Sequence, residues 1–204
     1  NKLRMSSDII FYWQSKKDGG QAAAINKGIR KSTGDVIAYI NSDDYYLPKA
    51  FDWVEKYFTL HPEKEWLVGN CQISDPNLSW TFFLKHLWPI QYWRNALLIF
   101  NTVNQPSVFV KKSLVKKVGY FNENFSYAFD YDYWLRCNAK TLPGRLFKYL
   151  AVFRVHLGSK GNSNYFKQFE EDWKIFISQH PVSPYFFAHA LAKDFVNFVY
   201  KYLK

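Results

Sequence analysis

Residues 36–48 read VIAYINSDDYYLP, an apolar segment that ends in two adjacent acids and then reaches a proline. The apolar part, Val36 to Ile40, is typical of a buried strand, and Pro48 suits the first turn of a helix, where a missing amide hydrogen costs nothing. Asp43 and Asp44 therefore fall in the turn between these elements. In open α/β sheets ligands bind beyond the carboxyl ends of strands, and paired carboxylates there suit a divalent cation that also binds phosphate oxygens. The alternative is a solvated acidic turn in which one of the two acids caps the helix.

The segments around this run predict a repeated strand and helix pattern. Strands are expected from Ile9 to Trp13 and from Trp66 to Ile73, and helices from Gln21 to Lys31 and from Pro48 to Leu60. A strand, helix and strand in so few residues require a right-handed crossover between parallel strands. The sequence therefore predicts an α/β protein with a mainly parallel sheet flanked by helices.

Two further helices are expected at the end of the chain, from Tyr165 to Gln179 and from Pro184 to Lys204. The second has apolar residues on one face and Lys193 and Lys201 on the other. Such a helix packs on its own domain or lies in a membrane interface, and the sequence leaves both open. We expect one domain over residues 1–160 and a helical extension over residues 161–204. The aromatic-rich segment 80–100 departs from the strand and helix repeat and is either an insertion or a pair of short helices packed on the sheet.

Composition sets the class of protein and its partners. The chain has 204 residues, of which 48% are hydrophobic, and a formal charge of +10. It can bury a core, and it should attract anions such as nucleotide diphosphates, an acidic acceptor, an anionic membrane or nucleic acid. Cys71 and Cys137 match no disulfide framework or metal spacing, and no apolar run reaches about 18 residues. We expect a cytoplasmic protein, with peripheral contact at the inner face of the cell membrane as a further expectation.

Four separated blocks of sequence resemble family 2 glycosyltransferases of the GT-A fold. The blocks follow one another in the same order as in that family, and the resemblance runs from about Tyr12 to Lys160. The blocks lie at residues 18–48, 105–109, 127–136 and 153–160. The resemblance implies a GT-A-like sheet whose nucleotide-binding N-terminal βαβ unit is missing, so that the chain is expected to be a fragment or a shortened copy.

The resemblance also implies a metal site and a donor site. Asp44 is expected to be a ligand of Mn²⁺ or Mg²⁺, with His156 completing the site, although a lone histidine on a strand is usually structural. Asp43 is expected to reach the sugar nucleotide, and Lys160 to hold its phosphate oxygens. The polar residues Gln21 and Asn26, next to a tight glycine turn, are further candidates for donor contact.

Asp130 is the expected catalytic base. Transfer with inversion needs one carboxylate to take the proton from the acceptor hydroxyl. Asp130 and Asp132 lie about 200° apart around a helix, so only one of them can face a single site. The family pattern selects Asp130, although many members have a glutamate where Phe129 stands. The alternative makes Asp130 a helix cap.

The resemblance implies a metal-dependent, inverting glycosyltransferase. It would move a sugar from a nucleotide-sugar donor to a hydroxyl of a glycan or lipid-linked acceptor, in bacterial polysaccharide synthesis. One rival is a non-catalytic remnant that binds sugar or acceptor. The other is a basic nucleic-acid-binding domain, for which the chain has no recognisable motif, so no nucleic acid is expected.

Overall fold

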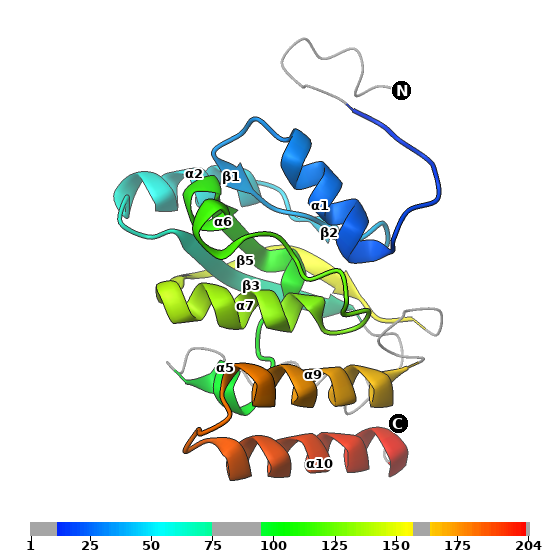
Figure 1. Cartoon of the computed structure of the whole chain (residues 1–204). Coiled ribbons are helices and arrows are strands. Elements are labelled where there is room, and N and C mark those ends of the chain that lie inside the picture. Colours follow the sequence, from blue (N-terminus) through cyan, green and yellow to red (C-terminus); the bar gives the residue numbers. More distant parts are fainter. Residues whose placement is uncertain (1–11, 75–94, 157–163, 203–204) are drawn as a thin grey trace.

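The computed structural model describes residues 12–74, 95–156 and 164–202. Its centre is a five-stranded sheet in the order β1-β4-β3-β5-β2 (Figure 1). The strands are β1 (Val36–Ile37), β2 (Tyr45–Tyr46), β3 (Trp66–Ser74), β4 (Val108–Lys111) and β5 (Gly144–Arg154). The pairing between β3 and β5 is parallel, and the other three pairings are antiparallel. Strands β1, β3 and β5 therefore share one direction, and the α/β class is confirmed, with a mixed sheet in place of a mainly parallel one.

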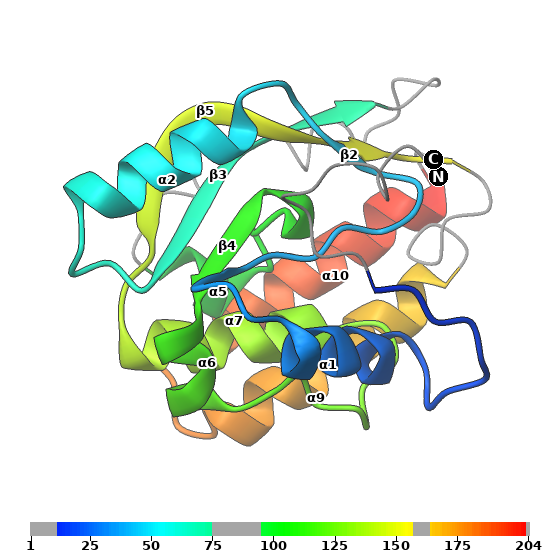
Figure 2. The same ribbon diagram turned by 90° about the horizontal axis from the view of Figure 1, so that it is seen from above.

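Helices cover both faces of this sheet. The elements are α1 (Gln21–Lys31), α2 (Ala50–Leu60), α5 (Ala96–Ile99), the 3-10 turn η2 (Gln105–Ser107), α6 (Lys112–Val118), α7 (Phe129–Lys140), α9 (Tyr165–Gln179) and α10 (Phe186–Tyr202). Alternation along β3 divides the core, because Trp66 and Val68 pack with α7 while Leu67 faces α2. Beyond α7, the helices α9 and α10 form two further layers (Figures 1 and 2).

The predicted helices agree closely with the observed ones, whereas two of the predicted strands do not. Helices α1 and α9 have the predicted bounds. The strand expected from Val36 to Ile40 is shorter, since only Val36–Ile37 pairs with β4. Residues 12 and 13 of the strand expected from Ile9 to Trp13 are not in a strand, and its other residues lie outside the described part, as does most of segment 80–100.

Buried contacts fix the two elements that carry the polar residues described next. The indole of Trp66 on β3 stacks on Trp134 of α7, with ring centroids 6.0 Å apart, and its Nε1 donates to the carbonyl of Thr141 at 2.8 Å. The hydroxyl of Ser107 in η2 donates to the carbonyl of Gly69 on β3 at 2.9 Å. The stacking of Trp66 on Trp134 holds α7 on the sheet. Ser107 is fully buried, so its hydrogen bond to Gly69 holds η2 there as well.

Candidate functional site

The acidic turn lies where β1 has ended and β2 begins. Asp44 is buried, and its Oδ1 accepts the backbone N–H of Arg154 at the end of β5, at 2.9 Å. Its Oδ2 lies 3.4 Å from Nδ2 of Asn41. Burial raises the pKa of Asp44, the hydrogen bond from Arg154 opposes this, and the charge of Asp43 raises it further. Asp44 therefore joins the acidic turn to β5.

Asp43 points to the more open side of the same turn. Its Oδ2 lies 3.0 Å from Nε2 of His156, with 35% of the aspartate side chain and 48% of the histidine side chain exposed. Nε of Arg154 donates to the backbone carbonyl of Asp43. The structure thus places Asp43, of the two acids, beside His156, whereas the sequence led us to expect Asp44 there.

Amide side chains connect this turn to two other elements. Nε2 of Gln21, the first residue of α1, donates to Oδ1 of Asn41 at 2.8 Å. The Nδ2 of Asn41 lies 3.4 Å from Oε1 of Gln105 in η2, and Nε2 of Gln105 donates to the carbonyl of Tyr39 at 2.6 Å. Asn41 therefore links α1, η2 and the acidic turn. Its only signal in the sequence is its place as the first polar residue after the apolar segment.

Asp130 lies in the first turn of α7. Its Oδ1 accepts the backbone N–H of Tyr131 at 2.8 Å. Burial raises the pKa of Asp130 to about 6, opposed by hydrogen bonds from the backbone N–H groups of Tyr131 and of Asp130 itself and from the side chain of Asn101. A carboxylate with a pKa near 6 is largely ionised at neutral pH and still basic enough to accept a proton.

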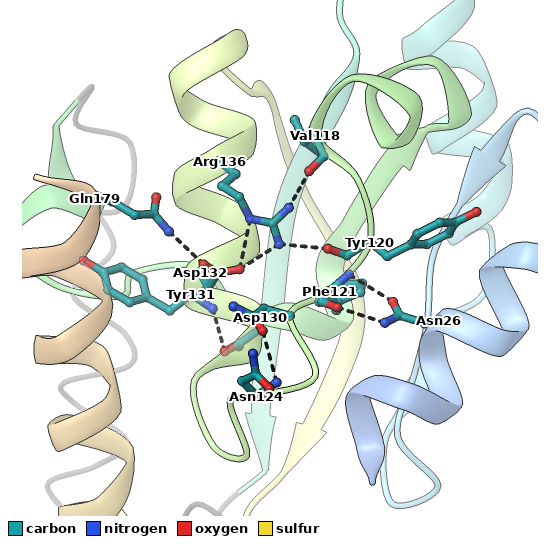
Figure 3. A network of polar contacts seen from close by, with 11 residues as sticks. Asn26, Val118, Tyr120, Phe121, Asn124, Asp130, Tyr131, Asp132, Arg136 and Gln179 are labelled. Carbon is teal, nitrogen blue, oxygen red and sulfur yellow. Dashed lines mark hydrogen bonds and ion pairs between the residues drawn. The ribbon is translucent and has the colours of Figure 1, made fainter. Parts of the chain in front are cut away.

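Asp132 turns to the other side of α7, as the helical spacing predicts. Its Oδ2 accepts hydrogen bonds from Nη2 and Nε of Arg136 at 2.7 and 3.0 Å, and its Oδ1 accepts one from Gln179 of α9 at 2.8 Å (Figure 3). Arg136 also donates to the carbonyls of Val118 and Tyr120. Asp132 is therefore occupied in holding α7 to its neighbours.

Tyr39 connects Asp130 electrostatically with the acidic turn. The pKa of the Tyr39 phenol is raised well above its ordinary value by burial, then by the charges of Asp130, Tyr46 and Asp44. Since the phenol senses both carboxylates, it lies within electrostatic reach of each. Asp130 and Asp44, which are far apart in sequence, therefore both act on the same phenol.

The structure leaves Asn26 buried and does not test Lys160 as a donor contact. The Asn26 side chain is 1% exposed, and its Nδ2 donates to the carbonyl of Phe121 at 2.9 Å and to Oε1 of Glu123 at 2.8 Å. Its Oδ1 accepts the N–H of Phe121 at 3.0 Å (Figure 3). The amide of Asn26 therefore holds α1 to the loop before α7 and is not available to bind a nucleotide-sugar donor. Lys160 lies outside the described residues.

The chemistry of Asp43 and His156 fits a divalent cation. Carboxylate oxygen and imidazole nitrogen are both ligands that Mn²⁺ accepts, and Oδ2 and Nε2 lie at a hydrogen-bond distance of 3.0 Å from each other. Across residues 12–74, 95–156 and 164–202, no three His, Cys, Asp or Glu side chains gather closely enough to hold a metal by themselves. Phosphate oxygens and water would have to supply the remaining ligands, which is the usual arrangement for Mg²⁺ in phosphate chemistry.

Comparison with known proteins identifies the class first from the fold. The S. aureus TarS structure in complex with UDP-GlcNAc superposes with a TM-score of 0.63 at 13% identity, covering 99% of this chain and 59% of that one. TarS has the GT-A fold, so the expected fold is confirmed.

Sequence comparisons give similarity to glycosyltransferases as well. Residues 2–94 match the model of glycosyl transferase family 2. An uncharacterized glycosyltransferase of Rickettsia typhi is 25% identical over 182 residues, which are 84% of this chain and 56% of the relative. One of Mycobacterium tuberculosis is 30% identical over 133 residues, which are 61% of this chain and 47% of the relative. The chain is thus similar to family 2 of the glycosyltransferases over residues 2–94, and it spans about half the length of these curated relatives.

Proposed function

We propose that this chain contributes the metal and base residues of an inverting sugar transfer from a nucleotide-sugar donor to an acceptor hydroxyl. The observation that carries the proposal is the arrangement of Asp43 beside His156, with 3.0 Å between Oδ2 and Nε2. The match of residues 2–94 to the family model supports a transferase, and the UDP-GlcNAc bound by TarS supports a nucleotide-sugar donor.

Each residue has a distinct task in this proposal. Asp130 accepts the proton of the acceptor hydroxyl as its oxygen attacks the anomeric carbon. Asp43 and His156 would hold Mn²⁺ or Mg²⁺, and the ion would neutralise charge on the departing nucleoside diphosphate. Asp44 keeps the turn in register with β5 through the N–H of Arg154, and Gln21 orients Asn41 beside it.

The direct test is acceptor-dependent release of the nucleoside diphosphate. The chain, with Mn²⁺, would be incubated with a panel of nucleotide sugars that includes UDP-GlcNAc, with and without glycan and lipid-linked acceptors. We expect release that requires both the ion and an acceptor. Calorimetric binding of a donor without any release would instead favour the non-catalytic sugar-binding remnant.

We also propose that α10 contacts an anionic membrane surface, where a lipid-linked acceptor would lie. Its outward face carries five apolar side chains between 54% and 78% exposed: Phe187, Leu191, Phe195, Phe198 and Tyr202. Lys201 adds positive charge near the end of the helix. Amphipathic helices with this distribution lie in the interface plane of a bilayer. Within the described part of the chain, each helix falls short of the length and apolar content needed to cross a bilayer.

Replacing Leu191 and Phe195 together by serine is expected to weaken vesicle binding by about tenfold for each residue, because burying such a side chain contributes about 1.5 kcal/mol or more. Cosedimentation with anionic phosphatidylserine vesicles measures this. Val182→Ser is the matched control, since Val182 is 96% exposed and lies before α10. A further substitution, Lys201→Glu, should reduce binding to anionic vesicles and leave binding to neutral ones unchanged. Absence of vesicle binding by the original chain would exclude the membrane role.

A further inference from the structure

The loop that leads into α7 is held by a carboxylate from a distant part of the chain. Oε2 of Glu171, on α9, accepts the backbone N–H groups of Tyr127 at 2.7 Å, Ala128 at 2.9 Å and Ser126 at 3.1 Å. Its Oε1 accepts the N–H of Ser126 at 3.1 Å. One side chain thus binds three consecutive amides.

These three amides directly precede the turn that carries Asp130. Ala128 is the N-cap residue of α7, and it has no side-chain oxygen that could cap the helix. Glu171 binds the amides that lead into α7 and not those of its first turn. Its charge beside the start of the helix also interacts favourably with the positive end of the helix. Asp130 follows Ala128 by two residues, so the path of residues 126–128 sets where its carboxylate points.

Helix α9 holds α7 at a second point as well. Gln179, two turns beyond Glu171, donates to Oδ1 of Asp132 at 2.8 Å (Figure 3). Between these two contacts, the buried Ile175 and Phe176 of α9 belong to the same hydrophobic core as α7. The first turn of α7 is therefore fixed from α9 on both sides of Asp130.

We propose that Glu171 is a positioning residue for Asp130, acting through the backbone of residues 126–128. The inference rests on the proposed function, in which Asp130 is the base. It assigns to α9, which lies outside the segment matched by the family model, a defined part in the transfer step. Misplacement of a reacting group by about 1 Å can lower a rate by about 100-fold.

Glu171→Ala is expected to lower turnover of UDP-GlcNAc with Mn²⁺ by about 10- to 100-fold with the KM for the donor unchanged, because donor and metal contacts lie elsewhere. Glu171→Gln keeps an acceptor oxygen and should restore turnover to within a few fold. Glu170→Ala is the matched control, since Glu170 is an exposed neighbour on the same helix. A larger KM with unchanged turnover in Glu171→Ala would overturn the proposal.

A double-mutant cycle separates positioning from general loss of stability. In the Asp130→Asn background, Glu171→Ala should cause no further loss of turnover, because the group that it positions is already gone. An equal further loss in that background would show that Glu171 acts otherwise. Full turnover in Asp130→Asn would overturn the base, and with it the positioning role.

Hydrogen exchange tests the contact itself without an activity assay. The amides of Tyr127 and Ala128 should exchange at least tenfold faster in Glu171→Ala than in the original chain, while the amides of β3 keep their protection. Unchanged exchange at both amides would refute the contact. Faster exchange with unchanged turnover, when Asp130→Asn is inactive, would refute the positioning role and leave the proposed function standing.

Discussion

Asp130→Asn is expected to lower sugar transfer by about 10²- to 10⁴-fold, because the amide cannot accept the proton of the acceptor hydroxyl. The substitution keeps the size of the side chain and an oxygen that can accept the N–H of Tyr131. Donor and metal binding should survive, since Asp43 and His156 are unchanged. Turnover and calorimetric donor binding, measured on the same preparation, check both parts.

The pH dependence gives this prediction a second measurement. The pKa of Asp130 is raised to about 6, so kcat/KM of the original chain should fall as the pH drops through about 6 and the carboxylate becomes protonated. Asp130→Asn should have low activity without this acidic limb. A limb that persists in the variant would show that another group is the base.

As the pH rises through about 6, the thermal stability of the original chain should fall while its activity rises. An unfolded aspartate ionises near pH 4, whereas Asp130 in the fold ionises near 6. Between these values the folded chain binds more protons than the unfolded chain, so this group makes the fold less stable as the pH rises. Asn at position 130 does not ionise, so the variant should gain thermal stability relative to the original chain from pH 4 to pH 7.

Asp132→Asn provides the contrast. The original side chain pairs with Arg136 at 2.7 Å and also accepts from Gln179. Loss of the charge should lower stability by about 1 to 3 kcal/mol while most activity is retained, because Asp132 faces away from the site. Loss of activity equal to that of Asp130→Asn would contradict the assignment of a single base.

Local pattern was sufficient to predict much of the fold. The apolar spacing of α1 and α9 is complete within each segment, and both helices have the predicted bounds. The strand after residue 35 was overestimated because only Val36 and Ile37 find partners on β4, and the availability of partners is a property of the tertiary structure. The mixed character of the sheet depends on β4 and β2, which the β-α-β pattern does not reveal.

The candidate site shows the same limit more sharply. Asn26 and Gln21 are both amides on α1, and nothing local distinguishes them. Oδ1 of Asn26 accepts the backbone N–H of Phe121, 95 residues further on. Nε2 of Gln21 instead donates to Asn41. Glu171 had no sequence signal at all, because its partners are backbone amides, which any residue supplies.

Adjacent acids in a turn present a similar problem. Which of Asp43 and Asp44 faces inward depends on the pairing of β2 with β5, in which Tyr45 lies opposite Val152. That register brings the N–H of Arg154 to Asp44 and leaves Asp43 on the side of His156. The motif predicts an acidic site, and the long-range register decides the task of each acid.

Asp43→Asn is accordingly expected to reduce Mn²⁺-dependent binding of UDP by at least about 100-fold, because the amide keeps the shape but loses the anionic ligand. His156→Ala should reduce it less, since a neutral ligand attracts a hard cation less strongly than a carboxylate does. Titration calorimetry with and without Mn²⁺, together with circular dichroism, gives the affinity and shows whether each variant is folded.

Asp44→Asn tests which of the two adjacent acids binds the metal ion. Asp44 was expected from the sequence to be the ligand itself, whereas its hydrogen bonds to Arg154 and Asn41 suit a supporting role. Supporting residues of metal sites typically change affinity by about 10- to 100-fold, so this variant should bind Mn²⁺ and UDP more weakly than the original chain but better than Asp43→Asn. Broadening of the His156 ring signals by Mn²⁺ reports the site independently of any turnover. It should persist in Asp44→Asn and disappear in Asp43→Asn, and the reverse result would make Asp44 the ligand.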